Sequence, residues 1–279
     1  MAHFLIVGLG DIGSGLAQSF MNQGHKVSAI RRKPTASKGV VLYAQDILHA
    51  APLRLPAEKP QAVFIIVTPE ERSQVAYEAA FLTLPERLLR AMESAYHALP
   101  PVVFVSSTAV YGQGSTMSEN SPTEPQAFNG QVLLRAEAKI RAATQATVVR
   151  FSGIYGPGRE SRIRLARALA LGEKSTPKAV WSNRIHSEDV VGLLHHLGEL
   201  WAAGHTPPAV VVGTDNHPVV NLKVLNWLAQ QQGLPLNMKW DAVSGRKVMS
   251  GYIAQGHYTL RYPSFREGYA ALLGINPTP

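Results

Sequence analysis

The chain has 279 residues, of which 46% are hydrophobic and 16% charged, which suits one large or two modest globular domains and excludes a disordered chain. It contains no cysteine, which excludes disulfides, thiolate metal sites and a cysteine nucleophile and fits a reducing, cytoplasmic compartment. The net charge of +8 fits a solvated basic surface or an anionic ligand such as a dinucleotide or nucleotide-sugar, and the scattered arginines argue against nucleic acid.

Apolar runs rich in β-branched residues alternate with helix-like segments through the first half of the chain. The runs predict strands over residues 3–7, 25–30, 40–44, 62–67, 101–106 and 146–151. The segments between them predict helices over residues 14–24, 70–98 (with a break near Pro85) and 130–144. The opening run ends in glycines and has no basic leader, so we interpret it as a strand and not as a signal peptide.

The composition of the chain changes after about residue 155, where proline and glycine become frequent and the predicted elements become shorter. Helices are predicted over residues 162–172, 187–202 and 219–233, and a strand over 208–213. The alternation predicts a doubly wound α/β fold of the Rossmann type with a parallel sheet. We expect a nucleotide-binding domain over residues 1–155 and a smaller C-terminal substrate lobe over 156–279, which shares the core through a soft boundary.

A full G-x-G-x-x-G pattern, VGLGDIG, stands between the first predicted strand and the first predicted helix. Gly8 allows a tight turn, Gly10 lets the backbone approach a pyrophosphate, and Gly13 lets the helix pack against the strand. The helix start, with Asp11 and Ile12, then faces the phosphate charge. The pattern predicts a dinucleotide site in this strand–turn–helix context, and the alternative is a tight turn without a ligand.

The residues after the second strand favour NADP over NAD. An NAD site usually has Asp or Glu at this position to bind the ribose 2′-hydroxyl, whereas this chain has Arg31 and Arg32, whose guanidinium groups attract a 2′-phosphate. The alternative is a basic surface turn. Asp46, after the third strand, is expected to reach the adenine or else to serve as a cap or turn residue. Val67, at the end of the fourth predicted strand, and Thr68, directly after it, are further expected cofactor contacts.

Four motifs in one order resemble the extended short-chain dehydrogenase/reductases, the NAD-dependent epimerase/dehydratase-like group. They are GLGDIG, SSTAVYG, RFSGIYGPGR and NRIHSEDVV, which cover about the first 200 residues. The late segment YPSFREGYAALL is similar to the closing segment of an atypical branch of that family. The resemblance implies an NAD(P)-dependent oxidoreductase, epimerase or dehydratase that acts on a small anionic or sugar-type carbonyl or hydroxyl substrate.

The resemblance also implies a catalytic set, and this chain carries only part of it. In the family a Ser or Thr orients the reacting oxygen, a Tyr exchanges its proton, and a Lys four residues on lowers the pKa of that Tyr. The Ser position falls on Ser107, with Thr108 as an assistant. Setting FNGQVLLRAE against the family pattern P-Y-G-x-S-K-x-x-x-E puts Asn129 at the Tyr position and Leu133 at the Lys position. Neither exchanges a proton, so Asn129 is expected to hydrogen-bond the substrate instead.

Three explanations of the missing Tyr–Lys pair stay open. Another residue acts as the acid, the candidates being Tyr111, Tyr155 and His186, although the tyrosines equally fit packing roles and the histidine a hydrogen bond at a helix start. Alternatively, water serves as the acid in a reaction with a mild proton demand. The third explanation is a different class of protein, a catalytically inactive NADP-binding sensor or scaffold.

The resemblance places further ligand contacts in the second half of the chain. The stretches YGPGRE and NRIH bind substrate phosphates in the family, which implies Arg159 and Arg184 as substrate-binding residues. For Arg164 and Arg167, which follow the first stretch, the alternative is a helix with solvated arginines. Phe151, Gly153 and Ile154 would line the nicotinamide, or else they simply end a strand.

The remaining expectations concern partners. The ten histidines form no H-E-x-x-H pattern, so no metal is expected. No apolar stretch is long enough to cross a bilayer. The expected partners are therefore a small-molecule substrate and, by family analogy, a second copy of the chain that pairs through the helices of residues 70–98 and 128–144.

Overall fold

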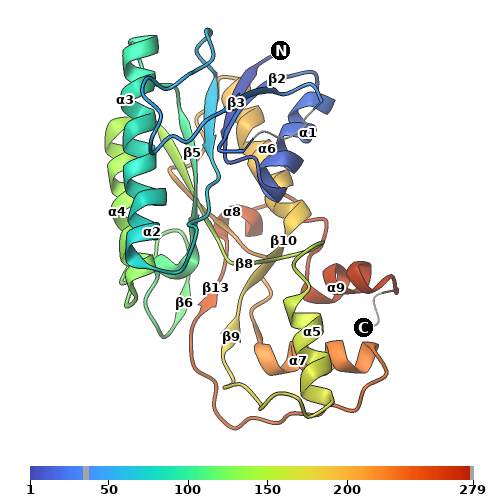
Figure 1. Cartoon of the computed structure of the whole chain (residues 1–279). Helices are drawn as coiled ribbons and strands as arrows, with labels where there is room; N and C mark the ends of the chain where they lie inside the picture. Colours follow the sequence, from blue (N-terminus) through green and yellow to red (C-terminus); the bar gives the residue numbers. More distant parts are fainter. Residues whose placement is uncertain (34–37, 277–279) are drawn as a thin grey trace. The chain divides into compact units, whose positions relative to one another are not determined.

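A computed structural model describes residues 1–33 and 38–276 and divides the chain into two compact units (Figure 1). The first unit comprises Met1–Val110, Thr123–Arg150 and Val191–Val211, and the second comprises the rest. The main change of unit along the chain comes after Arg150, and the functional division of the chain near residue 155 stays a prediction. A single boundary does not describe the chain, however, because Tyr111–Pro122 joins the second unit and Val191–Val211 returns to the first.

A seven-stranded sheet in the order β11-β7-β5-β4-β1-β2-β3 is the frame of the first unit. Its strands are β1 (His3–Val7), β2 (Lys26–Arg31), β3 (Val41–Ala44), β4 (Ala62–Ile65), β5 (Val102–Ser107), β7 (Ala146–Phe151) and β11 (Val210–Gly213). The pairings of β1 with β2 and β4, of β2 with β3, and of β4 with β5 are parallel. This arrangement confirms the predicted doubly wound α/β fold and brings the ends of β1, β2 and β4 to one edge.

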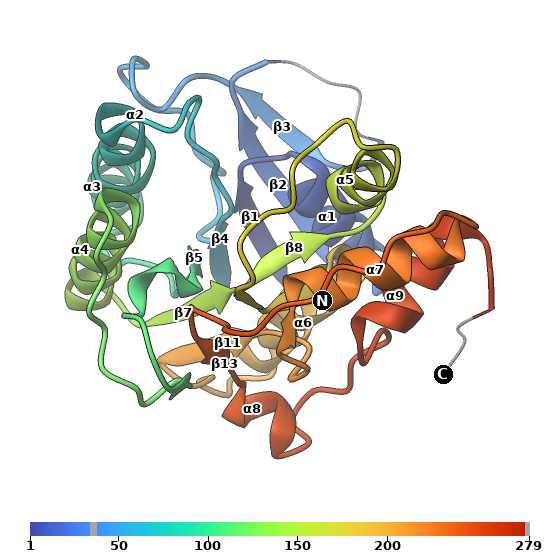
Figure 2. The same cartoon turned by 90° about the horizontal axis from the view of Figure 1, so that it is seen from below.

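The helices of the first unit cover both faces of this sheet, as Figures 1 and 2 show. One face carries α2 (Gln74–Glu78), α3 (Leu84–Tyr96) and α4 (Phe128–Ala143), and the other carries α1 (Asp11–Asn22) and α6 (Ser187–Ala202). The predicted break near Pro85 is wrong, because a π-helical turn over Ala79–Thr83 joins α2 to α3. Pro85 lies in the first turn of α3, where a missing N–H costs little.

Two glycines explain why α6 packs closely on the first unit although it lies far along the sequence. A Cβ at Gly198 would lie 2.4 Å from the ring of Phe20, and a Cβ at Gly15 would lie 3.0 Å from the side chain of Val191. Each position therefore lacks a side chain where α6 meets α1. The returning helix thus covers the same face of the sheet as α1 and completes the core on that side.

The second unit is built from short elements. Its strands are β6 (Thr116–Met117), β8 (Gly153–Tyr155), β9 (Trp181–Ser182), β10 (Arg184–His186), β12 (Val219–Val220) and β13 (Lys247–Val248). They pair as β8 with β10, β9 with β12, and β6 with β13. Its helices are α5 (Ser161–Ala170), α7 (Asn221–Gln231), α8 (Gly251–Ala254) and α9 (Phe265–Leu273).

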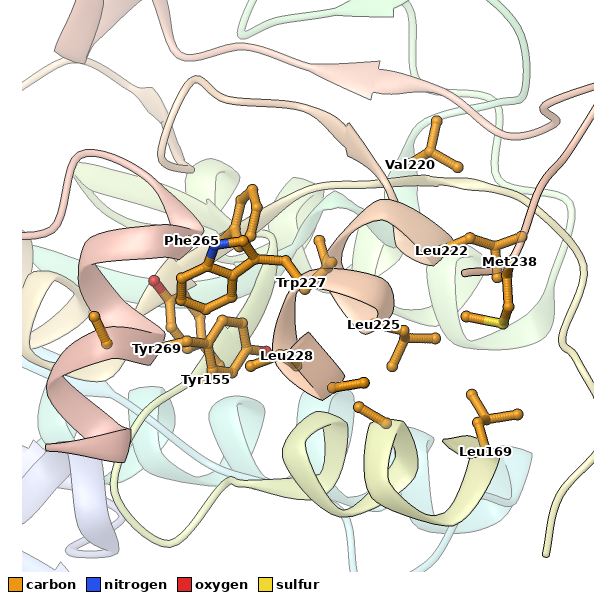
Figure 3. Close-up of a cluster of buried hydrophobic side chains, with 14 residues drawn as sticks. Tyr155, Leu169, Val220, Leu222, Leu225, Trp227, Leu228, Met238, Phe265 and Tyr269 are labelled. Atoms are coloured by element: carbon orange, nitrogen blue, oxygen red, sulfur yellow. The ribbon is translucent and has the colours of Figure 1, made fainter. Parts of the chain in front are cut away.

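The second unit has a hydrophobic core of its own, contributed mainly by α5, α7 and α9 (Figure 3). Leu169 of α5 and Leu225 of α7 belong to it, and the Trp227 ring meets the Phe265 ring edge-on at a centroid distance of 5.5 Å. Burial of these aromatic and aliphatic side chains stabilises the unit by the hydrophobic effect. Across residues 1–33 and 38–276, no helix is both long and apolar enough to cross a membrane.

Candidate functional site

The loop after β1 meets the three geometric demands that its glycines predict. Gly8 has a φ of +100°, and a Cβ there would lie 2.0 Å from the carbonyl oxygen of Ile66. A Cβ at Gly13 would lie 2.1 Å from the carbonyl oxygen of Gly8, so α1 packs directly on the turn. At Gly10 a Cβ would meet nothing within 4 Å. Gly8 and Gly13 are therefore required by the fold, whereas Gly10 borders open space.

That open space belongs to a cavity of about 480 Å³ at the carboxyl ends of β1, β2 and β4. Seven of the residues predicted to bind the cofactor line it: Gly8, Gly10, Arg31, Arg32, Asp46, Val67 and Thr68. Three more, Asp11, Ile12 and Gly13, form the first turn of α1, directly after Gly10. The structure thus brings together, within one unit, ten of the predicted cofactor residues, which the sequence scatters over the ends of β1, β2, β3 and β4.

The walls of this cavity favour an anion. Gly10 is the N-cap of α1 and offers no side-chain acceptor to the first N–H groups of the helix, so the positive end of the helix dipole faces the cavity side. Arg31, the last residue of β2, is half-buried, and its guanidinium has no partner among residues 1–33 and 38–276. Arg32 is paired with Glu70, another residue that lines the cavity.

Asp46 lies in a turn at the edge of the cavity. Its Oδ1 accepts a hydrogen bond of 2.9 Å from Leu48 N, and its Oδ2 lies 3.1 Å from His49 Nδ1. Burial raises the pKa of Asp46, but these hydrogen bonds outweigh it and hold the pKa below its ordinary value. The carboxylate therefore has the turn role that the sequence offered as an alternative, and its contact with adenine stays a prediction.

The end of β5 carries the hydroxyl predicted to orient a substrate. Ser107 closes the strand, and its Oγ accepts a hydrogen bond of 3.2 Å from Ala109 N within the 3₁₀ turn Thr108–Val110 that follows. A Cβ at Gly130 would lie 2.3 Å from Ala109 O, so α4 begins directly against this turn. Asn129, one residue earlier, is therefore held at the same end of β5 as Ser107.

The position of the family lysine is filled by a core residue. Leu133 is only 3% exposed and lies on the buried side of α4. Its side chain contributes to the packing of the first unit and has no proton to exchange. The two positions of the Tyr–Lys pair thus hold a half-buried amide, Asn129, and a buried aliphatic side chain.

A buried charged cluster next to Ser107 escaped the sequence analysis. Ser106 Oγ donates a hydrogen bond of 2.6 Å to Glu137 Oε1, and Arg150 Nη2 donates one of 2.6 Å to Glu137 Oε2. All three residues are buried, and they tie the ends of β5 and β7 to α4. Two signals were present: Glu137 matches the last residue of the family pattern, and Arg150 interrupts an otherwise apolar strand.

Tyr111, Tyr155 and His186, the candidates for an alternative acid, are all buried in the second unit. Tyr155 Oη donates to Ser264 O at 3.3 Å, and burial moves the pKa of Tyr155 far above its ordinary value. His186 Nδ1 accepts a hydrogen bond of 3.2 Å from Glu188 N, and burial lowers the pKa of this histidine. These contacts are the packing and helix-start roles that the sequence offered as alternatives.

The predicted nicotinamide and phosphate contacts also belong to the second unit, and none of them is among the residues that line the cavity described above. Phe151 packs its ring on Gly213, where a Cβ would lie 2.3 Å away. Gly153 and Ile154 belong to β8, which pairs in parallel with β10. Gly153 is exposed, whereas Ile154 and Arg159 are partly buried.

Arg184 and Asp215 form a buried charged group in the second unit. Arg184 Nη2 donates to Ser182 Oγ at 2.6 Å, its guanidinium lies 5.5 Å from the Phe265 ring centroid, and burial lowers its pKa. Asp215 Oδ1 accepts a hydrogen bond of 2.9 Å from His217 N. Burial raises the pKa of Asp215 to about 7, opposed by that hydrogen bond and by the charge of Arg184. Asp215 was missed because its burial comes from segments far apart in sequence.

Metal ligation is not supported at any described position. Among residues 1–33 and 38–276, no three His, Asp or Glu side chains gather in a group able to hold a metal ion.

The glycine loop, the cavity beside it and the serine at the end of β5 are typical of dinucleotide-binding α/β proteins. Comparison with known proteins identifies the family. The chain belongs to the NAD dependent epimerase/dehydratase family, whose model matches residues 4–213. Protein YeeZ of Escherichia coli (strain K12) is 28% identical over 220 residues, which cover 74% of this chain and 76% of YeeZ.

Two solved structures extend the likeness over almost the whole chain. A Methylobacillus flagellatus protein, provisionally assigned as an NAD-dependent epimerase/dehydratase, is 31% identical, covers 98% of both chains and has a TM-score of 0.83. MoeE5, solved in complex with UDP-glucose and NAD, is 25% identical, covers 96% of both chains and has a TM-score of 0.75.

Proposed function

We propose that this chain is an NADP-dependent oxidoreductase of the epimerase/dehydratase type that acts on a small anionic or sugar-type carbonyl or hydroxyl substrate without the usual Tyr–Lys pair. The observation that carries the proposal is the glycine loop, whose Gly10 opens onto a cavity flanked by the guanidinium of Arg31. Membership of the family supports a nicotinamide dinucleotide as the cofactor.

The cavity fits such a cofactor in three respects. The first turn of α1 and Gly10 would hold the pyrophosphate through backbone N–H groups, because Gly10 has no side chain and borders open space. Arg31 would hold the 2′-phosphate, since a guanidinium matches a phosphate in charge and geometry. When bound, the nicotinamide supplies a carbon that exchanges hydride with the substrate. Asp46, Val67 and Thr68 would contact the adenosine half.

The chain's own groups would then position the substrate. Ser107 Oγ would donate a hydrogen bond to the reacting oxygen while it accepts one from Ala109 N. Asn129, held at the same strand end, would add an amide hydrogen bond without titrating. We propose Arg159 and Arg184 for the substrate anion, Phe151, Gly153 and Ile154 for the nicotinamide, and Thr108 and Tyr111 as assistants. The UDP-glucose bound to MoeE5 supports a nucleotide-sugar as the first substrate to try.

A second candidate function is a catalytically inactive NADP-binding sensor or scaffold. One specific observation favours it: the Lys position holds Leu133, which is buried in the core of the first unit. Tyr155 adds to this argument, because its hydroxyl already donates to Ser264 O and burial raises its pKa. Neither residue could take over the proton exchange in its present place.

Calorimetric titration with NADPH and NADH, followed by NADPH oxidation with a panel of aldehydes, ketones and nucleotide-sugars, separates the two functions. The enzyme predicts binding and turnover, and the sensor predicts binding alone. Arg31→Ala should weaken NADPH about tenfold or more and leave NADH within about twofold. Arg135→Ala, which removes an exposed arginine on α4 that lines neither cavity, is the matched control. Failure of both nucleotides to bind at millimolar levels would overturn both functions.

A homodimer and a cytoplasmic location complete the proposal. Between α3 and α4 lies a groove of about 200 Å³, lined by apolar side chains that include Leu89 and Ile140 and by charged ones that include Arg90 and Lys139. A partly apolar groove on two long helices supports pairing with a second copy. Sedimentation velocity at micromolar concentration should give about twice the mass of one chain, and a single-chain mass would contradict the dimer.

A further inference from the structure

An ion pair connects the two loops that flank the glycine turn. Arg32 directly follows β2, and Glu70 follows β4 by five residues. In the sheet β1 lies between these two strands (Figure 2). Because the three strands are parallel, the loops leave from the same edge, and the Arg32–Glu70 pair joins them on either side of the end of β1.

Arg31 and Arg32 therefore differ although they are neighbours in sequence. Arg31 is half-buried and has no side-chain partner within the part of the chain that the structure describes. The side chain of Arg32 is 55% exposed and is occupied by Glu70, whose side chain is 70% exposed. Both arginines and Glu70 line the same cavity. One guanidinium is thus available to a ligand, and the other is shared with a carboxylate.

We infer that Glu70 is a specificity-determining residue that limits the preference for a 2′-phosphorylated nucleotide by holding Arg32. The inference rests on the proposed NADP function. Glu70 holds Arg32 through Nη1, so a 2′-phosphate that takes the Nη1/Nη2 edge of this guanidinium has to displace the carboxylate. Glu70 also places a negative charge beside the incoming phosphate. Neither effect acts on a nucleotide with a free 2′-hydroxyl. Glu70 therefore reduces the difference between the affinities of the chain for NADPH and for NADH.

The size of the effect follows from the exposure of the pair. Exposed ion pairs contribute little interaction free energy, so Glu70 lowers the preference for NADPH over NADH only moderately. Glu70→Gln should raise the ratio of the NADH to the NADPH dissociation constant about two- to fivefold, mainly by tightening NADPH. The gain should shrink at high salt, because exposed charges are screened within a few ångströms at molar ionic strength.

The test is calorimetric titration of both nucleotides into the full chain and its variants. Glu71→Gln is the matched control, because it removes an exposed carboxylate one residue further on that does not line the cavity. A ratio that rises in Glu70→Gln and stays unchanged in Glu71→Gln supports the inference. A ratio that is unchanged or falls in Glu70→Gln, while the wild type binds NADPH, overturns it and leaves the NADP proposal intact.

A second pair of variants asks whether Glu70 acts through Arg32. In an Arg32→Ala background, Glu70→Gln should change the ratio by less than half of its effect in the wild type. An undiminished effect would overturn the competition for Arg32, since Glu70 would then act on the phosphate alone. Failure of the wild type to bind either nucleotide would instead remove the proposed function, and this inference with it.

Discussion

The two units hold their buried carboxylates in opposite ways. Glu137 in the first unit accepts a hydrogen bond from Ser106 and a bidentate set from Arg150. Asp215 in the second unit accepts one from His217 N, and its Oδ2 has no hydrogen-bond partner among the described residues. The first carboxylate is neutralised by a buried cation at contact distance, whereas the second is left with a pKa of about 7.

The buried carboxylate of the first unit, Glu137, therefore has a structural role, whereas the buried carboxyl of the second unit, Asp215, is able to change its charge. In the first unit the charged cluster joins the ends of β5 and β7 to α4, next to Ser107. In the second unit a buried carboxyl titrates near neutral pH, and such groups gather at functional sites. The predictions below test whether the two buried carboxylates contribute to stability as differently as their surroundings imply.

Removing the anion of the first unit should have the largest effect. Glu137→Ala leaves the Arg150 guanidinium buried without its partner, which should lower the free energy of unfolding by about 3–5 kcal/mol. Urea denaturation measures the change. Glu93→Ala, which removes an exposed carboxylate from α3, is the control and should stay within about 0.5 kcal/mol. A loss below about 1 kcal/mol in Glu137→Ala would show that the cluster does not frame the unit.

The carboxylate of the second unit should make stability depend on pH. Burial raises the pKa of Asp215 from 3.8 to about 7, so the folded chain holds this proton more tightly than the unfolded chain does. The resulting stability is complete below about pH 4 and is lost as the pH rises through 7. Asn stays neutral throughout, so Asp215→Asn should gain on the wild type by up to about 4 kcal/mol over this range.

Unfolding by urea at pH 4, 5.5 and 7.5 measures that gain. Asp241→Asn changes an exposed carboxylate in the same unit and should show no comparable trend with pH. A difference between Asp215→Asn and the wild type that stays constant from pH 4 to 7.5 would mean that the Asp215 carboxyl does not titrate as its burial implies. It would also remove the contrast between the two units.

The next largest loss of stability should come from replacing Gly8 in the glycine turn. Gly8→Ala forces a φ of +100° on a residue with a side chain and puts its Cβ 2.0 Å from Ile66 O. The expected loss is about 2–4 kcal/mol of unfolding free energy, measured by urea denaturation. Gly24→Ala, also at a positive φ but with nothing within 4 Å of its Cβ, isolates the cost of the backbone conformation from that of the clash.

The first unit was predictable because its signals are local. The six predicted strands are present, and the glycine spacing located the cavity, because periodicity and turn chemistry act between near neighbours in sequence. The π-helical turn before Pro85 was not predictable in this way, since residues 74–96 form one continuous helical run despite the proline.

The second unit was less predictable because its polar groups meet through distant segments. Asp215 and Arg184 are far apart in sequence, and the fold brings them together so that Asp215 N donates a hydrogen bond to Arg184 O. Glu137 and Arg150 similarly belong to different elements, α4 and β7, although the family pattern marked the glutamate. The return of α6 to the first unit likewise depends on close packing between distant positions, at Gly15 and Gly198.

The most direct test of the account is the affinity of Gly10→Ala for NADPH. Gly10 has nothing within 4 Å of an added Cβ and an ordinary φ of −83°, so the variant should keep the wild-type melting temperature within about 2 °C. If the backbone at Gly10 receives the pyrophosphate, the added methyl group should weaken NADPH binding about tenfold or more. Unchanged affinity in a stable Gly10→Ala protein would contradict the placement of the dinucleotide in this cavity.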